Sequence, residues 1–512
     1  MNQMNRPIKR ISIAVLVLFV VLLVNVNYLQ AVQAPSLANK PLNDRAQFEQ
    51  NQVQRGNIVT SDNVVIATSK PSNGQFKYQR SYPFGAVYAP VTGFDSVFTP
   101  TEAPNYATGV ERAEYPLLNG NGSQLAFRNF IDMITNKPQQ GATVQVTINS
   151  KAQQAAYQQL AAQLAGKTFN GHQEVGGVVA LNPSTGAILA MASYPSFNPD
   201  VLAVHSTQTA GTLYQQLSTE NPSPLINNAT QTTLPPGSSF KIVTSSAWYA
   251  QDVTRNTTTL VSSPQPLPLP NGNTLNNDGG EQCGNGSGLT PVLQAFAQSC
   301  NTPFAKIGMQ IGGSTIGSMA SKFGFDNASF FDIPGVAAAP SNFTAEEDPS
   351  FTALDAIGQH DTTETPLQEA MIAATVANGG VMMKPYLIQQ VTSSDLATLS
   401  QTSPQQLGTP ISPTIDNYEK QMMLAVVQQP YGTAAAYDSA AEGGLKIAGK
   451  TGTAQTGVNP TSDAVFTAFA PFDNPKIAVG VMIQGGGYGA SAAAPIAVAV
   501  IKAYLASQGI AS

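Results

Sequence analysis

The sequence predicts an α+β fold behind a membrane anchor, and three observations carry this prediction. The chain has 512 residues, of which 42% are hydrophobic, so it can bury the cores of about two to four domains. Strand-like apolar segments occur in 176–194 and again in 446–484, with mostly helical sequence between them. This order is typical of a sheet that pairs distant parts of one chain. The third observation is a long apolar run near the N-terminus.

That run predicts a single membrane-spanning helix. As a helix rising about 1.5 Å per residue, 11–29 would be about 28 Å long, close to the ~30 Å hydrocarbon core of a bilayer. A cleaved signal peptide is the alternative, since small residues follow, but the apolar run is long for one. Basic residues within 1–10 predict a cytoplasmic tail, a single-pass anchor in the cell membrane and an extracytoplasmic remainder.

Two regions follow the anchor. Residues 36–55 are polar and rich in Gln and Asn, which favours a helical or extended stalk. Residues 56–100 alternate β-branched and polar side chains between Gly and Pro breaks, so we expect short strands there. A more continuous pattern begins at Val144. We therefore expect a smaller N-terminal domain over 36–143 and a larger domain over 144–512.

The larger domain begins with a strand over 143–149. Ser150 is then expected to cap a helix that ends near Gly166. Two apolar strands follow, joined as a hairpin at 183–186. The closing elements are three strands and a helix, expected within 446–454, 465–471, 476–484 and 495–507.

Composition excludes several classes of function. Charged residues make up 11% of the chain and the net charge is −6, without a basic cluster beyond the N-terminus that could neutralise a phosphate backbone. We therefore expect no nucleic-acid binding. Two cysteines and three histidines are too few for zinc-finger arrays or iron–sulfur clusters, and no HExxH motif occurs. We expect neither a metal nor a cofactor.

Ser238-Ser239-Phe240-Lys241 is the first of three short motifs that indicate chemistry. It follows a Pro-Pro-Gly turn and opens an apolar helix, so Ser238 and Lys241 would share one helix face. A neutral Lys241 amine could then take the Ser238 proton. Desolvation against Phe240 and the helix dipole would both disfavour the ammonium form. An N-cap serine beside a surface lysine is the alternative.

Ser299-Cys300-Asn301 is the second motif. It lies between two Thr-Pro pairs, at 290–291 and 302–303, each of which predicts a helix start. The triplet would thus occupy an exposed break between helices, where a hydroxyl and an amide could relay a proton and hold a substrate amide. SxN alone carries little weight, because it recurs at 61–63 and 196–198.

Lys450-Thr451-Gly452-Thr453 is the third motif, within a predicted strand. The two-residue period would put Thr451 and Thr453 on one face and Lys450 with Gly452 on the other. Hydroxyls beside an edge-strand backbone suit a substrate carboxylate and an added peptide strand, and Gly452 would allow backbones to approach closely.

A phosphate-binding loop is the competing interpretation, because 444–451 fits GxxxxGK[ST]. Such a loop needs an apolar strand before it and a helix after it. The flanking sequence offers neither, and nucleoside triphosphates would be absent outside the membrane.

SxxK, SxN and KTG, in that order, resemble the signature of the penicillin-recognising serine acyltransferases. Three further stretches resemble the class B penicillin-binding proteins, the monofunctional D,D-transpeptidases: RGNI at 55–58, 177–199, and IGQ at 357–359 with the following TPLQEA. The resemblance covers most of the chain from Arg55 onward and is strongest to actinobacterial A-type members. Asn63 departs from the family pattern where Gly is usual, and a cysteine fills the middle of SxN.

The resemblance implies a penicillin-binding transpeptidase or serine β-lactamase-like fold. A five-stranded antiparallel sheet would lie between helical clusters, on a smaller N-terminal pedestal of the dimerisation type. Too few residues separate the anchor from Val144 for a glycosyltransferase domain.

The resemblance also implies a D,D-transpeptidase that cross-links peptidoglycan stem peptides through a serine acyl-enzyme. Lys241 would deprotonate Ser238, which attacks the penultimate D-Ala carbonyl. Ser299, held by Lys450, would return the proton to the leaving amine, and Asn301 would bind the substrate amide. Backbone N–H groups would stabilise the oxyanion.

At the third motif, the resemblance implies that Thr451 and Thr453, with Gly452 between them, bind the substrate near its terminal carboxylate. Backbone N–H groups of Ser238 and Thr453 would form the oxyanion hole.

The family role would be cell wall synthesis, and with it cell division and cell shape. The implied partners are stem peptides, β-lactam antibiotics that acylate Ser238, a membrane-embedded glycan polymerase and other cell-division proteins. Two other activities stay open. A β-lactamase would need a deacylating carboxylate, and the sequence places none clearly. A sensor or scaffold of the same fold would be acylated but transfer nothing.

Cys283 and Cys300 are the two cysteines of the chain, and both lie in the part expected outside the membrane, where disulfides persist. The glycines between them would let a bridge close and fasten the predicted long loop 263–289 to the SxN break. A bridge over such a loop should contribute about 3 kcal/mol. Two buried free thiols are the alternative.

Overall fold

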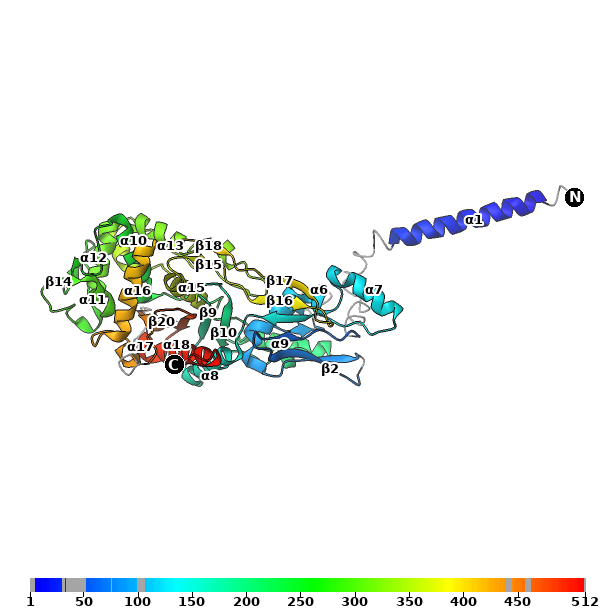
Figure 1. The fold of residues 1–512 in the computed structure, drawn as a ribbon, viewed down its shortest axis with the longest axis horizontal. Coiled ribbons are helices and arrows are strands. Elements are labelled where there is room, and N and C mark those ends of the chain that lie inside the picture. Colours follow the sequence, from blue (N-terminus) through cyan, green and yellow to red (C-terminus); the bar gives the residue numbers. More distant parts are fainter. Residues whose placement is uncertain are drawn as a thin grey trace.

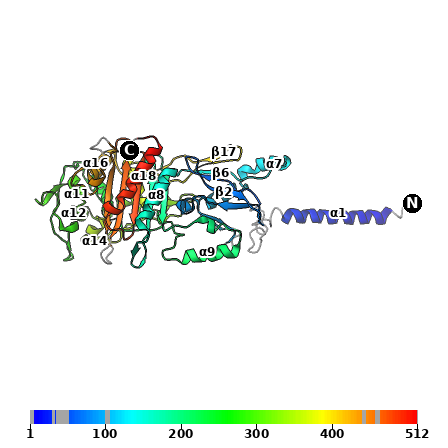
Figure 2. The ribbon, with the colours of Figure 1, turned by 90° about the horizontal axis from the view of Figure 1, so that it is seen from below.

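The N-terminal helix projects from the body of the protein. The computed structural model describes residues 5–29, 33, 52–74, 76–98, 106–438, 444–455 and 462–510. Helix α1 (Asn5–Tyr28) extends away from the rest in both views (Figures 1 and 2). Its segment Lys9–Tyr28 has a mean hydropathy of 2.5 and is unburied, so α1 is a candidate membrane anchor. The predicted stalk over 36–55 lies outside the described residues except for 52–55.

A five-stranded antiparallel sheet forms the centre of the larger domain, in the order β10-β9-β21-β20-β19. Its hairpin and its three C-terminal strands are those that the sequence predicts, so the α+β prediction is confirmed. All five strands are buried along nearly their whole length, which explains why their sequences are continuously apolar. Their bounds are β9 (Gly176–Leu181), β10 (Ile188–Tyr194), β19 (Ala448–Ala454), β20 (Asp463–Ala470) and β21 (Ile477–Ile483).

Helices cover both faces of this sheet. Helices α8 (Ser150–Leu164) and α18 (Ala494–Ser507) pack together on one face (Figures 1 and 2), and α15 (Pro366–Ala377) packs on the other. Gly480 lets α15 approach, since a Cβ there would lie 2.5 Å from the Ala370 nitrogen. The remaining helices of this domain are α10 (Lys241–Gln251), α11 (Val292–Ala297), α12 (Asn301–Ile311), α13 (Gly313–Lys322), α14 (Pro349–Asp355), α16 (Pro413–Gln428) and α17 (Gly489–Ala492).

Short two-stranded pairs complete the larger domain. One of them, β12 with β13, lies inside the loop predicted over 263–289. Their bounds are β7 (Thr168–Phe169), β8 (His172–Gln173), β11 (Leu260–Ser262), β12 (Leu267–Pro268), β13 (Thr274–Leu275), β14 (Leu289–Pro291), β15 (Met382–Met383) and β18 (Gln406–Gly408).

A second sheet of six strands, in the order β17-β16-β6-β1-β2-β3, connects the two regions of the chain. It confirms the short strands expected within 56–100, and it takes β16 and β17 from much later in the sequence. The domain boundary at 143/144 stays a prediction. The strands are β1 (Ile58–Val59), β2 (Val65–Pro71), β3 (Tyr78–Ser81), β6 (Thr143–Val146), β16 (Ile388–Thr392) and β17 (Thr398–Gln401).

Short helices and one long helix surround this second sheet. They are α4 (Ala89–Thr92), α5 (Gly109–Ala113), α6 (Tyr115–Leu118), α7 (Ala126–Ile134) and α9 (Thr207–Thr219), with the strand pair β4 (Asp95–Ser96) and β5 (Tyr106–Ala107) among them.

One helix cap and one turn differ in detail from the sequence pattern. The predicted cap Ser150 is the first residue of α8, and the cap is Asn149, whose Oδ1 accepts from Lys151 N and Ala152 N at 3.1 Å each. The Ser150 hydroxyl bonds to Asp62 instead. Asn63 has φ +63°, a left-handed conformation that asparagine tolerates better than most residues, which explains how it can stand in a place usual for Gly.

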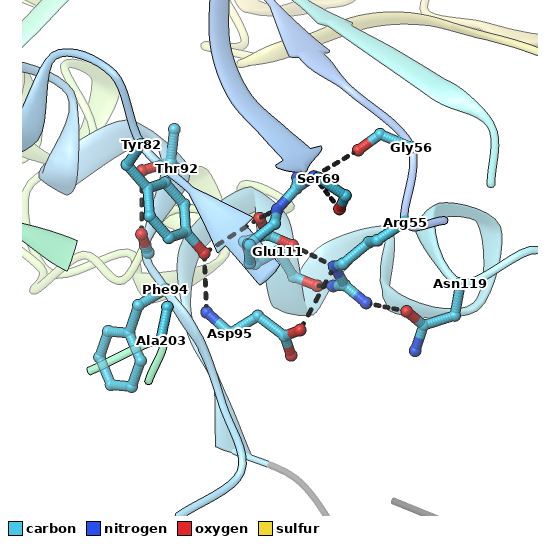
Figure 3. Close-up of polar contacts among 12 residues, drawn as sticks. Arg55, Gly56, Ser69, Tyr82, Thr92, Phe94, Asp95, Glu111, Asn119 and Ala203 are labelled. Carbon is cyan, nitrogen blue, oxygen red and sulfur yellow. Dashed lines mark hydrogen bonds and ion pairs between the residues drawn. The ribbon is translucent and has the colours of Figure 1, made fainter. Parts of the chain in front are cut away.

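A buried ion-pair network holds the N-terminal region together. Arg55 Nε and Arg80 Nε each donate to one oxygen of Glu111 at 2.6 Å, and all three side chains are buried. The Tyr82 hydroxyl donates to the same carboxylate at 3.1 Å, and Asn119 accepts from Arg55 (Figure 3). Burial alone would raise the pKa of Glu111, but the two guanidinium groups outweigh it and lower that pKa.

The network also explains the RG dipeptide at 55–56. A Cβ on Gly56 would lie 1.8 Å from the Ala142 oxygen, so no other residue fits there without displacing the backbone. The Gly56 carbonyl accepts from Arg80 Nη1 at 2.7 Å. Arg55 and Gly56 thus hold in place the segment that leads into β1: Arg55 through its ion pair with Glu111, and Gly56 through its close packing against Ala142.

Glu111→Gln should destabilise the protein by about 3–5 kcal/mol, because it leaves two buried guanidinium groups without their main counter-charge. Urea unfolding followed by far-UV circular dichroism measures this loss. The Glu111 contribution is complete above the ordinary glutamate pKa and is lost as the pH falls through the lowered folded-state value, so the difference between the two proteins should shrink in acid.

Asp473→Asn is the matched control, since it removes a carboxylate whose partner Lys446 and whose own side chain are both exposed. It should leave the unfolding curve unchanged. Equal destabilisation by both substitutions would contradict the role given to the network.

Candidate active site

Ser238 lies in a short 3-10 turn, Gly237–Phe240, that runs directly into α10. Gly237 has φ +56°, and a Cβ there would lie 2.7 Å from the Thr453 oxygen. Only glycine therefore lets the turn approach the third motif so closely. Ser238 is half-buried, whereas Ser239 and Phe240 point into the protein.

The Lys241 amine has three partners, two of which can only accept its N–H groups. Its Nζ lies 2.7 Å from the Ser299 carbonyl oxygen, 2.9 Å from Asn301 Oδ1 and 2.9 Å from Ser238 Oγ. The first two atoms can only accept, and Asn301 Nδ2 donates to the Asn276 oxygen, which fixes the orientation of the amide. An ammonium would donate to all three partners, whereas a neutral amine has two N–H donors and would turn its lone pair toward the Ser238 hydroxyl.

Burial favours the neutral state. The Lys241 side chain is wholly inaccessible to solvent, and this burial, followed by the positive charge of Lys450, lowers its pKa well below the ordinary value. Asp278 acts in the opposite direction and is the weaker influence. Phe240 was expected to desolvate the amine, but the aromatic ring over which the amine lies is Phe304, whose centroid is 5.5 Å from Nζ. Phe240 instead packs against Phe325 and Phe343.

The second motif occupies a break between α11 and α12, as predicted. The predicted caps Thr290 and Thr302 are wrong, because α11 is preceded by Pro291 and α12 begins at Asn301 after Cys300. Asn277 supplies the missing cap from the long loop. Its Oδ1 accepts from the backbone nitrogens of Asn301 and Thr302 at 2.8 and 3.0 Å.

Ser299 itself has φ +57°, a conformation that non-glycine residues adopt rarely. This backbone turns the Ser299 carbonyl toward Lys241 and leaves its hydroxyl for Lys450, whose Nζ lies 2.7 Å away. The strained residue therefore contacts both lysines.

A disulfide joins Cys283 to Cys300, which are 17 positions apart in sequence and have 5.9 Å between their Cα atoms. The predicted bridge is confirmed, and the free-thiol alternative is wrong. Both cysteines are buried, so the bond fastens the 263–289 loop beneath the second motif and holds the residues on either side of Cys300 in place.

Lys450 lies on β19, at the edge of the five-stranded sheet. Its side chain is fully buried, and Nζ donates to Ser299 Oγ at 2.7 Å and to the Thr451 oxygen at 2.9 Å. Burial lowers its pKa to about 7, even though Glu369 acts to raise it. Because Lys450 and Thr451 are strand residues, 444–451 is not a phosphate-binding loop.

The remaining residues of the third motif position the edge strand. A Cβ on Gly452 would lie 2.4 Å from the Pro236 oxygen, so glycine is required where the strand passes the serine turn. Thr451 Oγ1 and Thr433 Oγ1 are hydrogen bonded at 2.6 Å. The Thr453 carbonyl accepts from Gln359 Nε2 at 3.4 Å.

The structure thus brings the three motifs together. Ser238, Lys241, Ser299, Asn301 and Lys450 form one continuous chain of hydrogen bonds across three segments far apart in sequence. The other SxN matches are not part of it: Ser61 bonds to the Ile148 carbonyl and Ser196 to the Ala86 carbonyl.

Sequence reasoning missed several residues that contact this chain. Asn277, Gln359 and Thr433 bond to motif residues, and Glu369 lies behind them. Each belongs to a segment whose local pattern shows only a loop or a helix. The IGQ stretch and the following TPLQEA gave the available signals, for Gln359 and Glu369.

One group of described residues could hold a metal ion. The ligand atoms of Glu346, His360 and Asp361 lie within 4.8 Å of one another. In the described part of the chain, none of the three has a hydrogen bond to a motif residue.

The assembled site can move protons between hydroxyls and amines. A neutral Lys241 can accept the Ser238 proton. Ser299 contacts both lysines, because its carbonyl oxygen accepts from Lys241 and its hydroxyl oxygen accepts from Lys450. This is the arrangement of an activated serine nucleophile with an amine base.

Comparisons with known proteins agree with this geometry. The family "Penicillin binding protein transpeptidase domain" matches residues 176–502, and "Penicillin binding protein A dimerisation domain" matches residues 55–144.

Two relatives match over nearly the whole chain. The peptidoglycan D,D-transpeptidase PbpA of Mycolicibacterium smegmatis is 38% identical, over 98% of this chain and 99% of its own. The protein of the same name from Mycobacterium tuberculosis is 37% identical, over 99% and 100%.

Among solved structures, the imipenem acyl-enzyme complex of penicillin-binding protein A from M. tuberculosis superimposes with a TM-score of 0.80 at 36% identity. It covers 90% of this chain and 100% of that chain. The chain belongs to the penicillin-binding protein transpeptidase family.

Proposed function

We propose that this protein is a peptidoglycan D,D-transpeptidase that cross-links stem peptides through an acyl-enzyme on Ser238. The observation that carries the proposal is the fully buried Lys241 amine, which lies 2.9 Å from Ser238 Oγ and has two acceptor-only partners for its N–H groups. The mycobacterial relatives bear the name of this activity, and the related solved structures contain β-lactam acyl-enzymes.

In the acylation step, Lys241 takes the Ser238 proton as Oγ attacks the carbonyl carbon of the penultimate D-alanine. The Oγ–C bond forms and the carbonyl oxygen becomes an oxyanion, for which the backbone N–H groups of Ser238 and Thr453 are the proposed donors. The proton passes through Ser299 to the nitrogen of the terminal D-alanine, the C–N bond breaks, and D-alanine leaves.

In the second step, the amine of a neighbouring stem peptide attacks the acyl carbon. Its proton returns to Ser238 through the same amine and hydroxyl groups, and the Oγ–C bond breaks. Both halves of the reaction therefore use one proton relay in opposite directions, without a cofactor.

Substrate binding is proposed along the edge strand. β19 has a sheet neighbour on one side, so its other edge can pair with an extended stem peptide. Asn301 would hold the substrate amide, and Thr451 and Thr453 would hold its terminal carboxylate, with Lys450 supplying positive charge nearby.

We also propose that α1 anchors the protein in the cell membrane, with the N-terminus in the cytoplasm and the catalytic domain outside. The disulfide supports an extracytoplasmic location. A membrane-embedded glycan polymerase and other cell-division proteins are the proposed partners, with a role in cell division and cell shape. The N-terminal region over 36–143 would serve as the pedestal of the catalytic domain.

Ser238→Ala should abolish covalent labelling by fluorescent penicillin, because the attacking oxygen is lost. Labelling of the purified protein is read by gel fluorescence. Ser245→Ala is the matched control, since this buried serine two turns along bonds to carbonyls of its own helix and to the Glu419 side chain, and not to Ser238. It should label normally. A folded wild type that stays unlabelled would contradict the proposal.

Two further assays separate the alternatives. Rapid multiple turnover of nitrocefin would identify a β-lactamase. Penicillin labelling without release of D-alanine or cross-linking of a stem-peptide mimic would identify a sensor or scaffold. We expect slow nitrocefin turnover and measurable transfer to an added amine.

Replacing both Cys283 and Cys300 by serine should slow acylation severalfold while the domain remains folded. The physical reason is that the freed loop no longer fixes Ser299 and Asn301, and the unfolded chain regains entropy that costs about 3 kcal/mol of stability. Stopped-flow acylation measures the rate, and fluorescence of Trp248, the one tryptophan of the chain, checks the fold around α10. An unchanged acylation rate would show that the bridge does not position the site.

A further inference from the structure

Two glutamates that the proposed mechanism does not use lie buried behind the serine turn. Glu364 and Glu369 are both fully inaccessible to solvent. Glu364 pairs through its backbone with Leu234, just before the turn that carries Ser238, in two hydrogen bonds of 2.9 Å. Glu369 lies in the first turn of α15, which packs against the sheet.

The two carboxyl groups lie close enough for each to act on the pKa of the other. Both side-chain oxygens of Glu364 and Oε2 of Glu369 are buried without a hydrogen-bond donor among the described residues. Two carboxylates cannot bond without a proton, and two adjacent negative charges would be prohibitive in a buried site. The contact therefore requires one proton between the two groups.

The surroundings decide which group keeps the charge. Glu369 Oε1 accepts a short hydrogen bond from the Ser239 hydroxyl, whereas Glu364 has only Glu369 as a partner. Burial, and then the charge of Glu369, raise the pKa of Glu364 well above its usual range. Burial also raises the pKa of Glu369, but Glu364, Ser239 and Lys450 act to lower it. Glu364 is thus the neutral acid and Glu369 the carboxylate.

The carboxylate lies on the Lys450 side of the edge strand. Lys450 and Gly452 share one face of β19, and a Cβ on Gly452 would lie 3.3 Å from the Ser239 oxygen that binds Glu369. On the next strand, Thr467 stands opposite Lys450 and donates to the Glu369 backbone oxygen at 2.9 Å.

Few charges face this arrangement. Glu369 and the Lys241 amine are the ionisable groups that face Lys450 from α15 and α10, and Asp278 faces Lys241 from the long loop. Burial lowers the pKa of Lys450, and Glu369 is the group that acts to raise it.

We propose that Glu364 and Glu369 share one proton, and that the charge left on Glu369 holds Lys450 as an ammonium. Glu369 is then a positioning residue for serine acylation, acting through Lys450. The inference rests on the proposed function and assigns a role to a pair that lies outside the three motifs.

The charge states of Glu369, Lys450 and Lys241 are then linked in sequence. The Glu369 carboxylate keeps Lys450 positive, and the positive Lys450 helps to keep Lys241 neutral. Only a neutral Lys241 can take the Ser238 proton. Loss of the Glu369 charge should therefore impair the base on the far side of Ser299, although Glu369 itself touches neither Ser238 nor the substrate.

The test is the pH profile of penicillin acylation of Glu369→Gln. Without the carboxylate, the pKa of Lys450 falls, so its ammonium is lost at lower pH. The alkaline limb of the profile should shift to lower pH by about 1 pH unit or more. Acylation near pH 7 should then be slower than in the wild type and should recover as the pH is lowered. A purely structural defect would reduce the rate at every pH without moving the limb.

Glu364→Gln is the matched control, because the amide N–H replaces the shared proton and leaves Glu369 charged. Its alkaline limb should stay at the wild-type position. A folded Glu369→Gln with an unmoved limb, or equal shifts in both variants, would overturn the inference. The proposed function fails separately, if the wild type is not acylated at all.

Infrared difference spectroscopy of the wild type against Glu364→Gln keeps the inference testable if Glu369→Gln does not fold. At neutral pH, the wild type should show the C=O stretch of one protonated carboxyl that the variant lacks. Absence of that band would show that the pair holds no proton, and would overturn the proposal.

Discussion

Two lysine amines buried in one site are the constraint on which this structure depends. Lys241 and Lys450 are both inaccessible to solvent, and the hydroxyl and carbonyl of Ser299 lie between them. Two buried ammonium groups so close together would repel each other strongly, so the site divides the roles. In the proposed mechanism, one amine is neutral and serves as a base, and the other carries the positive charge. Serine activation follows from that division.

The fold brings these groups together from distant parts of the chain. The serine turn, the break before α12 and the edge strand meet only because the sheet pairs the C-terminal strands with the early hairpin. Glycines at 237 and 452 permit the close approach of turn and strand, and the disulfide holds the break from beneath. The ion-pair network around Glu111 likewise holds together segments of the N-terminal region. None of the proposed catalytic residues lies in that region.

Much of this could be predicted from the sequence, because the informative features are local. The three motifs, the buried strands and the cysteine pair each appear in short stretches. The exceptions are tertiary. Asn149 displaced Ser150 as a cap because both are good capping residues one position apart. Asn277 caps α12 across the long loop, and Phe304 replaces Phe240 against Lys241. The Glu364–Glu369 contact depends on how α15 packs, which no local pattern reveals.

The central claim is that Lys241 is neutral in the resting protein, and its titration tests this most directly. Protein labelled with ¹³C and ¹⁵N in lysine would be followed by NMR as a function of pH, with the Lys241 signal assigned by its loss in Lys241→Arg. The account predicts the chemical shifts of a neutral amine at pH 7, with protonation only in acid. A Lys241 signal that remains that of an ammonium up to the ordinary lysine pKa of 10.5 would contradict it.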